Sequence, residues 1–243
     1  MNKHIFWIAS YPKSGNTLLR AIVSSLFFSE DGCFDFKLLK KIPVIEDTAN
    51  LEFIKSTNID DYNNVHKIEI LSKYWLYMQT KKNLNFKDDF MFVKTHHALI
   101  RYLENHFTTT NLTRGFIYIV RDPRDIVLSM SNYYDISIEK SIDRITNDDF
   151  SFKWLDTKNL FKNKEIPFSY ISSWKNHYLS WNDHSFECPK LIISFEDLVY
   201  KKEKIINKII KFFTDNYGFE FSNLDKKIPQ IINQTSFNNL KKI

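Results

Sequence analysis

The sequence predicts an α/β protein with three layers, in which a central, mostly parallel sheet carries helices on both faces. Four short apolar runs, at 5–9, 90–93, 116–120 and 191–193, are each followed by a segment with helical spacing. Short apolar runs of this kind are typical of buried strands, and apolar residues recurring every three or four positions are typical of a helix. Alternation of strands and helices implies a parallel sheet that is covered on both sides.

The helices that follow these strands have recognisable starts and buried stripes. After the first strand, the stripe comprises Leu18, Leu19, Ile22, Val23 and Leu26. After the third strand, Asp122 is an N-cap and Pro123 occupies the first helical position. After the last strand, Glu196 opens a helix whose apolar residues are Leu198, Ile205, Ile206, Ile209, Ile210 and Phe213. The segments 27–89 and 131–174 are aromatic-rich and carry no clear periodicity.

Composition limits the classes of protein that need consideration. The chain has 243 residues, of which 43% are hydrophobic, with four glycines and six prolines, so we expect one domain over residues 1–243 without long linkers. The run at 5–9 is too short for a signal peptide or a membrane span, which predicts a cytoplasmic protein. Cys33 and Cys188 have no metal-ligand or redox spacing and are interpreted as packing residues.

The net charge of +5 favours neither nucleic acid nor a small anion by itself. The lysines between Lys201 and Lys211 are interleaved with Glu203 on a helical pattern, which indicates a solvated helix face. We therefore expect no nucleic-acid partner.

A polar loop between the first strand and its helix has the features of a phosphate cradle. It reads Tyr-Pro-Lys-Ser-Gly-Asn-Thr over 11–17. A helix N-terminus offers unpaired N–H groups to an anion, and Gly15 permits close approach of the backbone. Lys13 adds a point charge, while Ser14 and Thr17 add hydroxyl donors. The alternative is an ordinary polar turn with a solvent-exposed lysine.

Two further segments place chemically active side chains at strand ends. Phe-Val-Lys-Thr-His over 92–96 ends in an imidazole that is suited to accept a proton, and His97 is its competitor. Arg121 follows the third strand, with Ser129 two helical turns further on, and a guanidinium there is suited to a phosphate. Pairing of Arg121 with Asp125 is the structural alternative.

These segments, in this order, resemble those of the sulfotransferases that use 3′-phosphoadenosine 5′-phosphosulfate (PAPS). The resemblance runs from the first strand to Phe237 and implies a fold similar to that of P-loop nucleotide kinases. It implies that the loop residues Lys13, Ser14, Gly15, Asn16 and Thr17 bind the 5′-phosphosulfate. It further implies that Arg121 and Ser129 bind the 3′-phosphate and that Thr235 and Phe237 contact the adenine.

The same resemblance implies the catalytic roles. His96 is the general base, Lys13 stabilises the bridging oxygen of the donor, and Lys94 assists at the sulfuryl oxygens. The scheme requires no metal. The co-substrate is PAPS, and the acceptor is a small molecule, a sugar or a lipid with a hydroxyl group.

The sequence departs from the family pattern in three places. Leu18 stands where a tryptophan usually stacks on the adenine, and Phe195 replaces a tyrosine that reaches the nucleotide in some members. Beyond the position of Phe237, family members continue with an Arg-Lys-Gly segment that closes over the 3′-phosphate, whereas this sequence ends at Ile243. We expect either a domain truncated at its C-terminus or a site completed in another way.

Two other functions fit part of the pattern. A P-loop kinase or NTPase shares a phosphate loop between strand and helix, but its lysine follows the second glycine, whereas Lys13 precedes Gly15. A non-catalytic nucleotide-binding relative is favoured by Leu18 and by the end of the sequence. The acceptor pocket is not defined by the sequence, although Tyr133, Tyr134, Trp154 and Trp174 are candidates for it, and the oligomeric state is not readable.

Overall fold

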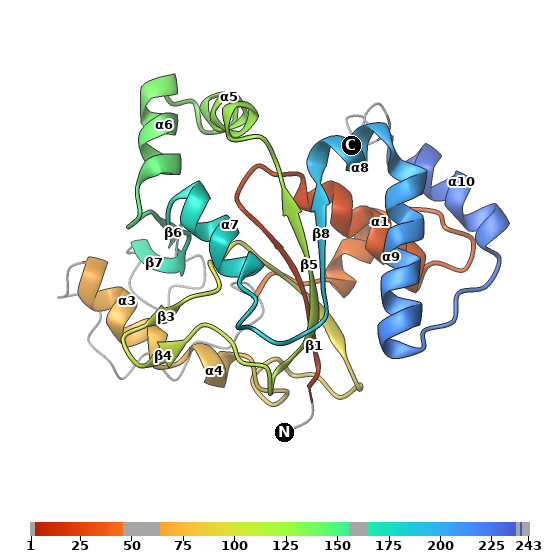
Figure 1. The fold of residues 1–243 in the computed structure, drawn as a ribbon, viewed down its shortest axis with the longest axis horizontal. Helices are drawn as coiled ribbons and strands as arrows, with labels where there is room; N and C mark the ends of the chain where they lie inside the picture. Colours follow the sequence, from red (N-terminus) through yellow and green to blue (C-terminus); the bar gives the residue numbers. More distant parts are fainter. Residues whose placement is uncertain (1–2, 46–63, 156–164, 237–238, 240–243) are drawn as a thin grey trace.

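A four-stranded parallel sheet lies at the centre of the molecule. The computed structural model describes residues 3–45, 64–155, 165–236 and 239. The strand order is β2-β1-β5-β8, and every neighbouring pair is parallel (Figure 1). Its strands are β1 (Ile5–Ser10), β2 (Met91–Thr95), β5 (Thr113–Val120) and β8 (Lys190–Ser194). All four predicted strands are therefore present, and the predicted parallel sheet is confirmed.

Helices cover both faces of this sheet, as expected. One face packs against α1 (Asn16–Phe28), α9 (Lys202–Tyr217) and α10 (Leu224–Gln234). The other packs against α3 (Asn64–Ser72), α4 (Trp75–Met78) and α7 (Trp174–Asn182). Along β1, Phe6 and Ile8 enter the first layer, whereas Trp7 enters the second, because successive side chains of a strand point to opposite faces. The three-layer α/β fold is confirmed.

The remaining helices gather at the carboxyl edge of the sheet. They are α5 (Pro123–Tyr134), α6 (Ile138–Thr146) and α8 (Phe195–Tyr200). Asp122 caps α5 as predicted, since its side chain accepts a hydrogen bond of 2.9 Å from the backbone N–H of Arg124, and Pro123 follows it. The loops and helix N-termini at this edge surround the carboxyl ends of the parallel strands, where ligands bind in sheets of this kind.

The helical segment after β8 differs from the prediction of one helix opened by Glu196. Ser194 is the N-cap of α8, and the chain leaves helical geometry at Lys201, with φ −130° and ψ 43°, before α9 begins. Leu198 and Ile205 are seven residues apart, so their spacing stays in phase across a one-residue break. The apolar pattern is therefore the same for one helix and for two.

The two segments without clear periodicity contain short elements. Besides α3, α4 and α6, they form the 3-10 helix η1 (Phe36–Lys41) and the antiparallel pair β6 (Ser151–Leu155) and β7 (Glu165–Tyr170). Between these two segments, a second two-stranded sheet pairs β3 (Arg101–Tyr102) with β4 (Asn105–His106). Residues 46–63 and 156–164 lie outside the described residues.

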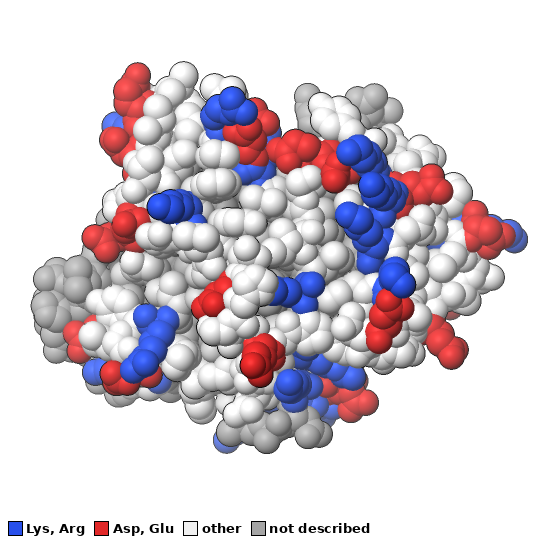
Figure 2. All heavy atoms as spheres, in the orientation of Figure 1, with Lys and Arg blue, Asp and Glu red and all other residues white. Residues whose placement is uncertain are grey.

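The exposed lysines lie in a row along α9, which Figure 2 shows as blue side chains. Two lysines at the ends of this segment form ion pairs, Lys201 with Asp197 at 2.8 Å and Lys211 with Asp215 at 2.9 Å. These pairs fit the expected solvated helix face. Cys33 and Cys188 are free thiols. In the part of the chain that the structure describes, no helix is long and apolar enough to cross a membrane, and the cytoplasmic location stays a prediction.

Candidate active site

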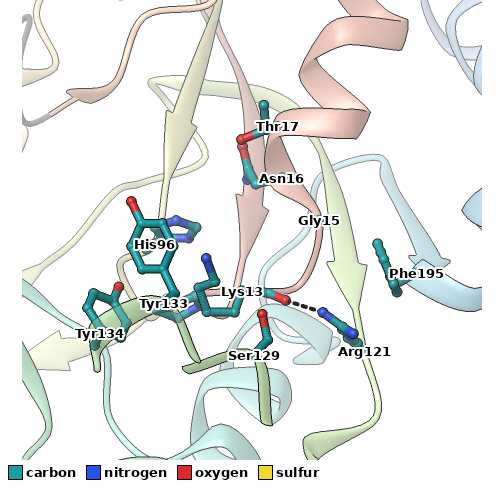
Figure 3. Close-up of a pocket in the computed structure, with 11 residues that line it drawn as sticks. Lys13, Gly15, Asn16, Thr17, His96, Arg121, Ser129, Tyr133, Tyr134 and Phe195 are labelled. Carbon is teal, nitrogen blue, oxygen red and sulfur yellow. Dashed lines mark hydrogen bonds between the residues drawn. The ribbon is translucent and has the colours of Figure 1, made fainter. Parts of the chain in front are cut away.

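A cavity of about 380 Å³ opens where β1, β2 and β5 end (Figure 3). Residues from four separate segments line it: Pro12, Lys13, Gly15, Asn16, Thr17, His96, Arg121, Ser129, Tyr133, Tyr134 and Phe195. Among the residues that the structure describes, no Asp or Glu belongs to this lining, whereas Lys13 and Arg121 do. A cavity with cations and without carboxylates favours an anionic ligand.

The loop between β1 and α1 adopts a conformation that opens the helix N-terminus to the cavity. Lys13 and Gly15 have positive φ values of 67° and 91°, which are rare for a residue other than glycine. Gly15 is the N-cap of α1, and no side chain of the described residues caps this helix. The first N–H groups of a helix have no partner within the helix. They therefore remain available to an anion at this end of the cavity, where the dipole of α1 is positive.

Two polar residues of the loop turn inward. The Asn16 amide donates hydrogen bonds to Ile8 O (3.2 Å) and Ser10 Oγ (3.1 Å), so its side chain ties α1 to β1. Ser14 is fully buried and does not line the cavity, and its Oγ has no partner among the described residues. Thr17 is exposed and lines the cavity with its neighbours Gly15 and Asn16.

His96 lines the cavity just after the end of β2. Its Nδ1 lies 2.8 Å from Ser10 O, and because a carbonyl oxygen only accepts, Nδ1 carries the proton. The neutral ring therefore has its basic lone pair on Nε2. Burial, and next the charge of Lys94, lower the pKa of His96 well below its ordinary value. The imidazole is consequently neutral near pH 7, which is the form that can accept a proton.

His97, the competing candidate, belongs to the core. It is 3% exposed, and its ring stacks on Phe107 with centroids 4.0 Å apart and planes 8° apart. Its Nδ1 donates to Ala98 O at 2.8 Å, and burial lowers its pKa to about 3. The structure thus brings His96, and not His97, to the cavity.

A third histidine supports the backbone of the second segment. His177 of α7 is fully buried and lies with Nε2 3.1 Å from His96 O, which means that Nε2 donates. Its Nδ1 is then an acceptor for the Tyr118 hydroxyl at 2.9 Å. Sequence reasoning did not single out His177, because its contacts to His96 and to Tyr118 of β5 arise only from the packing of α7 on the sheet.

Arg121 occupies the wall of the cavity opposite the tip of β2. Its Nη1 donates to Lys13 O at 2.9 Å, and its guanidinium carbon lies 4.3 Å from the centroid of the Phe195 ring. Arg121 therefore holds the loop between β1 and α1 through Lys13. Among the ion pairs of the described residues there is none between Arg121 and Asp125. The Nε atom of Arg121 is buried without a partner among the described residues. Ser129 of α5 lines the same cavity.

The structure does not place every predicted site residue in the cavity. Lys94 is half-buried in β2, outside the lining, but close enough for its charge to act on His96. Thr235 is fully buried, and its hydroxyl donates to Ile231 O at 2.6 Å, so it serves the end of α10. Phe237 lies outside the described residues.

Aromatic residues complete the lining. Tyr133 and Tyr134 of α5 are in it, as expected for two of the candidate pocket aromatics. Trp174 instead lines a neighbouring pocket with Arg121, and the side chain of Trp154 lies outside the described residues. Phe195 was not predicted as a site residue, because its place in the lining follows from its packing against Gly15 and Arg121.

The described side chains around the cavity do not form a metal-binding site. Within residues 3–45, 64–155, 165–236 and 239, no group of three or more His, Cys, Asp or Glu side chains is arranged to hold a metal ion. An uncapped helix N-terminus beside two cations and a neutral histidine instead matches an anionic substrate. The residues present fit the phosphate and sulfuryl groups of a nucleotide donor.

The fold and the cavity define an α/β protein with a cationic site at the carboxyl ends of its parallel strands. Comparison with known proteins then identifies the family: the model described as "Sulfotransferase domain" matches residues 3–243, and the chain belongs to that family. Membership favours the sulfotransferase interpretation over a P-loop kinase or NTPase.

Individual relatives are distant. The chain is 25% identical over 236 residues to "Sulfotransferase 1B1" of Canis lupus familiaris, covering 96% of this chain and 65% of the relative. It is 26% identical over 239 residues to "Luciferin sulfotransferase" of Photinus pyralis, covering 96% of this chain and 56% of the relative. The chain thus spans about 65% of the length of the first of these curated relatives.

Solved structures share the fold. Mouse sulfotransferase SULT7A1, complexed with PAP, matches with a TM-score of 0.55 at 18% identity, covering 100% of this chain and 67% of that one. Retinol dehydratase, in a complex with retinol and PAP, matches with a TM-score of 0.57 at 16% identity, covering 99% and 67%. The chain therefore has the same fold as these proteins, in agreement with the predicted α/β class.

Proposed function

We propose that this chain is a sulfotransferase that moves a sulfuryl group from PAPS to an acceptor hydroxyl by in-line transfer. The observation that carries the proposal is the cavity that gathers Lys13, His96, Arg121 and Ser129 beside the uncapped N-terminus of α1. Membership of the sulfotransferase family supports it, as does the binding of PAP by proteins that share the fold. Residues 1–243 then act as a single sulfotransferase domain.

Each residue has a distinct task in this reaction. The N–H groups at the start of α1, together with Lys13, Gly15, Asn16 and Thr17, hold the 5′-phosphosulfate. Ser14, which was predicted with them, is buried outside the lining. Arg121 and Ser129 bind the 3′-phosphate. Because Arg121 also fixes Lys13 O, occupation of the 3′-phosphate site and the shape of the loop are coupled through one guanidinium.

The protein then moves one proton and neutralises charge. Nε2 of His96 takes the proton of the acceptor hydroxyl as its oxygen attacks sulfur. The bond between sulfur and the bridging oxygen breaks, and the Lys13 ammonium neutralises the charge that develops on that oxygen. Lys94, whose charge acts on His96, assists at the sulfuryl oxygens in this scheme. This scheme assigns no role to a metal.

The acceptor is a small molecule, sugar or lipid with a hydroxyl group. Tyr133 and Tyr134 supply aromatic surface beside His96, which suits an acceptor with an apolar or ring-shaped body. Among the solved neighbours, retinol dehydratase has been found in complexes with retinol and with androsterone, both of which are apolar alcohols.

The experiment incubates purified protein with PAPS labelled in its sulfur and a panel of phenols, sugars and lipid alcohols. We expect label in at least one acceptor, and a loss of about 100-fold or more in His96→Ala. Lys13→Ala should lose turnover similarly while circular dichroism stays unchanged. His184→Ala, which alters an exposed histidine outside the cavity, is the matched control.

Three outcomes are informative. Transfer that depends on His96 and Lys13 supports the proposal. Binding of PAP without transfer to any acceptor would indicate the non-catalytic relative. Turnover in His96→Ala equal to that of the His184→Ala control would remove His96 from the role of base.

A further inference from the structure

An exposed tyrosine holds the ammonium of the loop lysine. The Nζ atom of Lys13 lies 3.3 Å from the centroid of the Tyr133 ring, at the face of that ring. Tyr133 belongs to α5 and lies one helical turn beyond Ser129, and both residues line the cavity (Figure 3). At 69% exposure, the ring contributes little to the core. Its most direct described contact with the site is therefore the one with Lys13.

The backbone of Lys13 is fixed independently of this contact. Its φ of 67° lies in the left-handed region, and its carbonyl accepts the hydrogen bond of 2.9 Å from Arg121. With the backbone held, the position of the ammonium depends on the rotamers of a long, flexible side chain. Lysine has about 2 kcal/mol of rotamer entropy, so a freely moving side chain spends little time at any one point.

Within the described lining of the cavity, the Tyr133 ring is the group that can stabilise the positive charge of Lys13. Among the described residues, the lining has no carboxylate, and Arg121 is a second cation in it. Burial, and next the charge of Arg121, lower the pKa of Lys13. The face of an aromatic ring carries the negative part of its quadrupole and favours the charged form of an amine. The Tyr134 ring stands perpendicular to the Tyr133 ring, with centroids 4.9 Å apart, and supports it from the side.

We propose that Tyr133 is a positioning residue that holds the Lys13 ammonium, in its charged form, over the cavity where the donor's bridging oxygen must lie. The part of this inference that concerns turnover rests on the proposed sulfuryl transfer, whereas the contact itself does not. Tyr133 acts through Lys13 and needs no contact with the reacting atoms to do so.

The first test measures the contact without any substrate. Amine acylation followed by peptide mass spectrometry gives the labelling rate of Lys13. We take the ratio of the rate at pH 7.5 to the plateau rate at high pH, so that differences between variants in the accessibility of Lys13 cancel. Loss of the ring in Tyr133→Leu should raise this ratio about 2- to 30-fold, the range of a cation–π contact between exposed and desolvated settings. Tyr133→Phe keeps the ring and should restore the wild-type ratio. Tyr200→Leu, at an 84% exposed tyrosine outside the cavity, is the control for surface substitution.

The second test measures turnover. Tyr133→Leu should lower kcat about 2- to 30-fold, and Tyr133→Phe should recover the lost rate, because the ring face and not the hydroxyl contacts Lys13. An unchanged labelling ratio in Tyr133→Leu overturns the contact. A raised ratio with an unchanged kcat overturns the positioning role. Absence of transfer by the unaltered protein, with a raised ratio in Tyr133→Leu, contradicts the proposed function and leaves the contact standing.

Discussion

Gly15, at the end of the loop between β1 and α1, should tolerate replacement by alanine poorly, for two separable reasons. Its φ of 91° places alanine in a left-handed conformation, which costs roughly 1–2 kcal/mol, of which about 0.4–1 kcal/mol is offset because alanine restricts the unfolded chain. A Cβ atom on Gly15 would also lie 2.7 Å from Cε2 of Phe195, and closer still to Cδ2. Overpacking of this kind costs roughly 1–3 kcal/mol more.

Gly218 provides a matched control for the backbone part of this cost. It caps α9 with φ 68°, and a Cβ there meets nothing within 4 Å. Gly218→Ala should therefore bear only the backbone cost, and Gly15→Ala should melt lower than Gly218→Ala by about 2–12 °C, at roughly 2–4 °C per kcal/mol for a protein of this size.

Calorimetry of both variants checks this difference, and the double variant Gly15→Ala, Phe195→Ala separates its parts. Removal of the ring should make the Gly15 substitution cheaper by the overpacking part alone. Equal melting temperatures for Gly15→Ala and Gly218→Ala would refute the argument, because they would mean that Phe195 moves aside without strain.

Two further predictions concern charge. Arg121→Ala should weaken binding of 3′-phosphoadenosine 5′-phosphate about 10- to 150-fold more than binding of the analogue without the 3′-phosphate, because it removes a charge-assisted hydrogen bond worth roughly 1.5–3 kcal/mol. Calorimetric titration of both nucleotides measures the two affinities. Equal losses of affinity would mean that Arg121 only holds the loop between β1 and α1. Because burial lowers the pKa of His97 and of His177 to about 3, the unfolded chain binds more protons below about pH 6.5, and stability should fall as the pH falls from there toward 3. At pH 5 each of these two histidines should lower the free energy of unfolding by roughly 2 kcal/mol. Urea unfolding at pH 7.5 and at pH 5 measures this loss, and His177→Gln should make the difference between the two pH values smaller. A free energy of unfolding that does not change with pH would contradict the prediction.

The sheet was predictable because its information is local. Strands buried on both faces read as short apolar runs, and parallel neighbours end at one edge. Lys13, His96 and Arg121 follow β1, β2 and β5, which are adjacent in the sheet, so their meeting follows once the strand order is known. The order itself is not local, because it depends on how the connecting segments pack.

The contacts within the site were less predictable, for the same reason. Asn16 was expected among the phosphate ligands, yet its side chain bonds to β1, which leaves its backbone N–H as the group available to an anion. Thr235 matches the family motif, but its side chain is satisfied within α10. The contact between Lys13 and Tyr133 joins residues 120 positions apart, a separation over which no sequence periodicity acts.

The choice between His96 and His97 illustrates what a single sequence leaves open. Val93, at the centre of β2, packs in the layer with Trp75, and two-residue alternation continues to His97, which packs against Trp75 and Phe107. His96 must then face the opposite way. The sequence shows that the two histidines point apart, but it does not show which face holds the cavity, because apolar helices cover both. The structure decides the matter, because His96 lies with Nδ1 2.8 Å from Ser10 O at the end of β1, next to the loop that leads to α1.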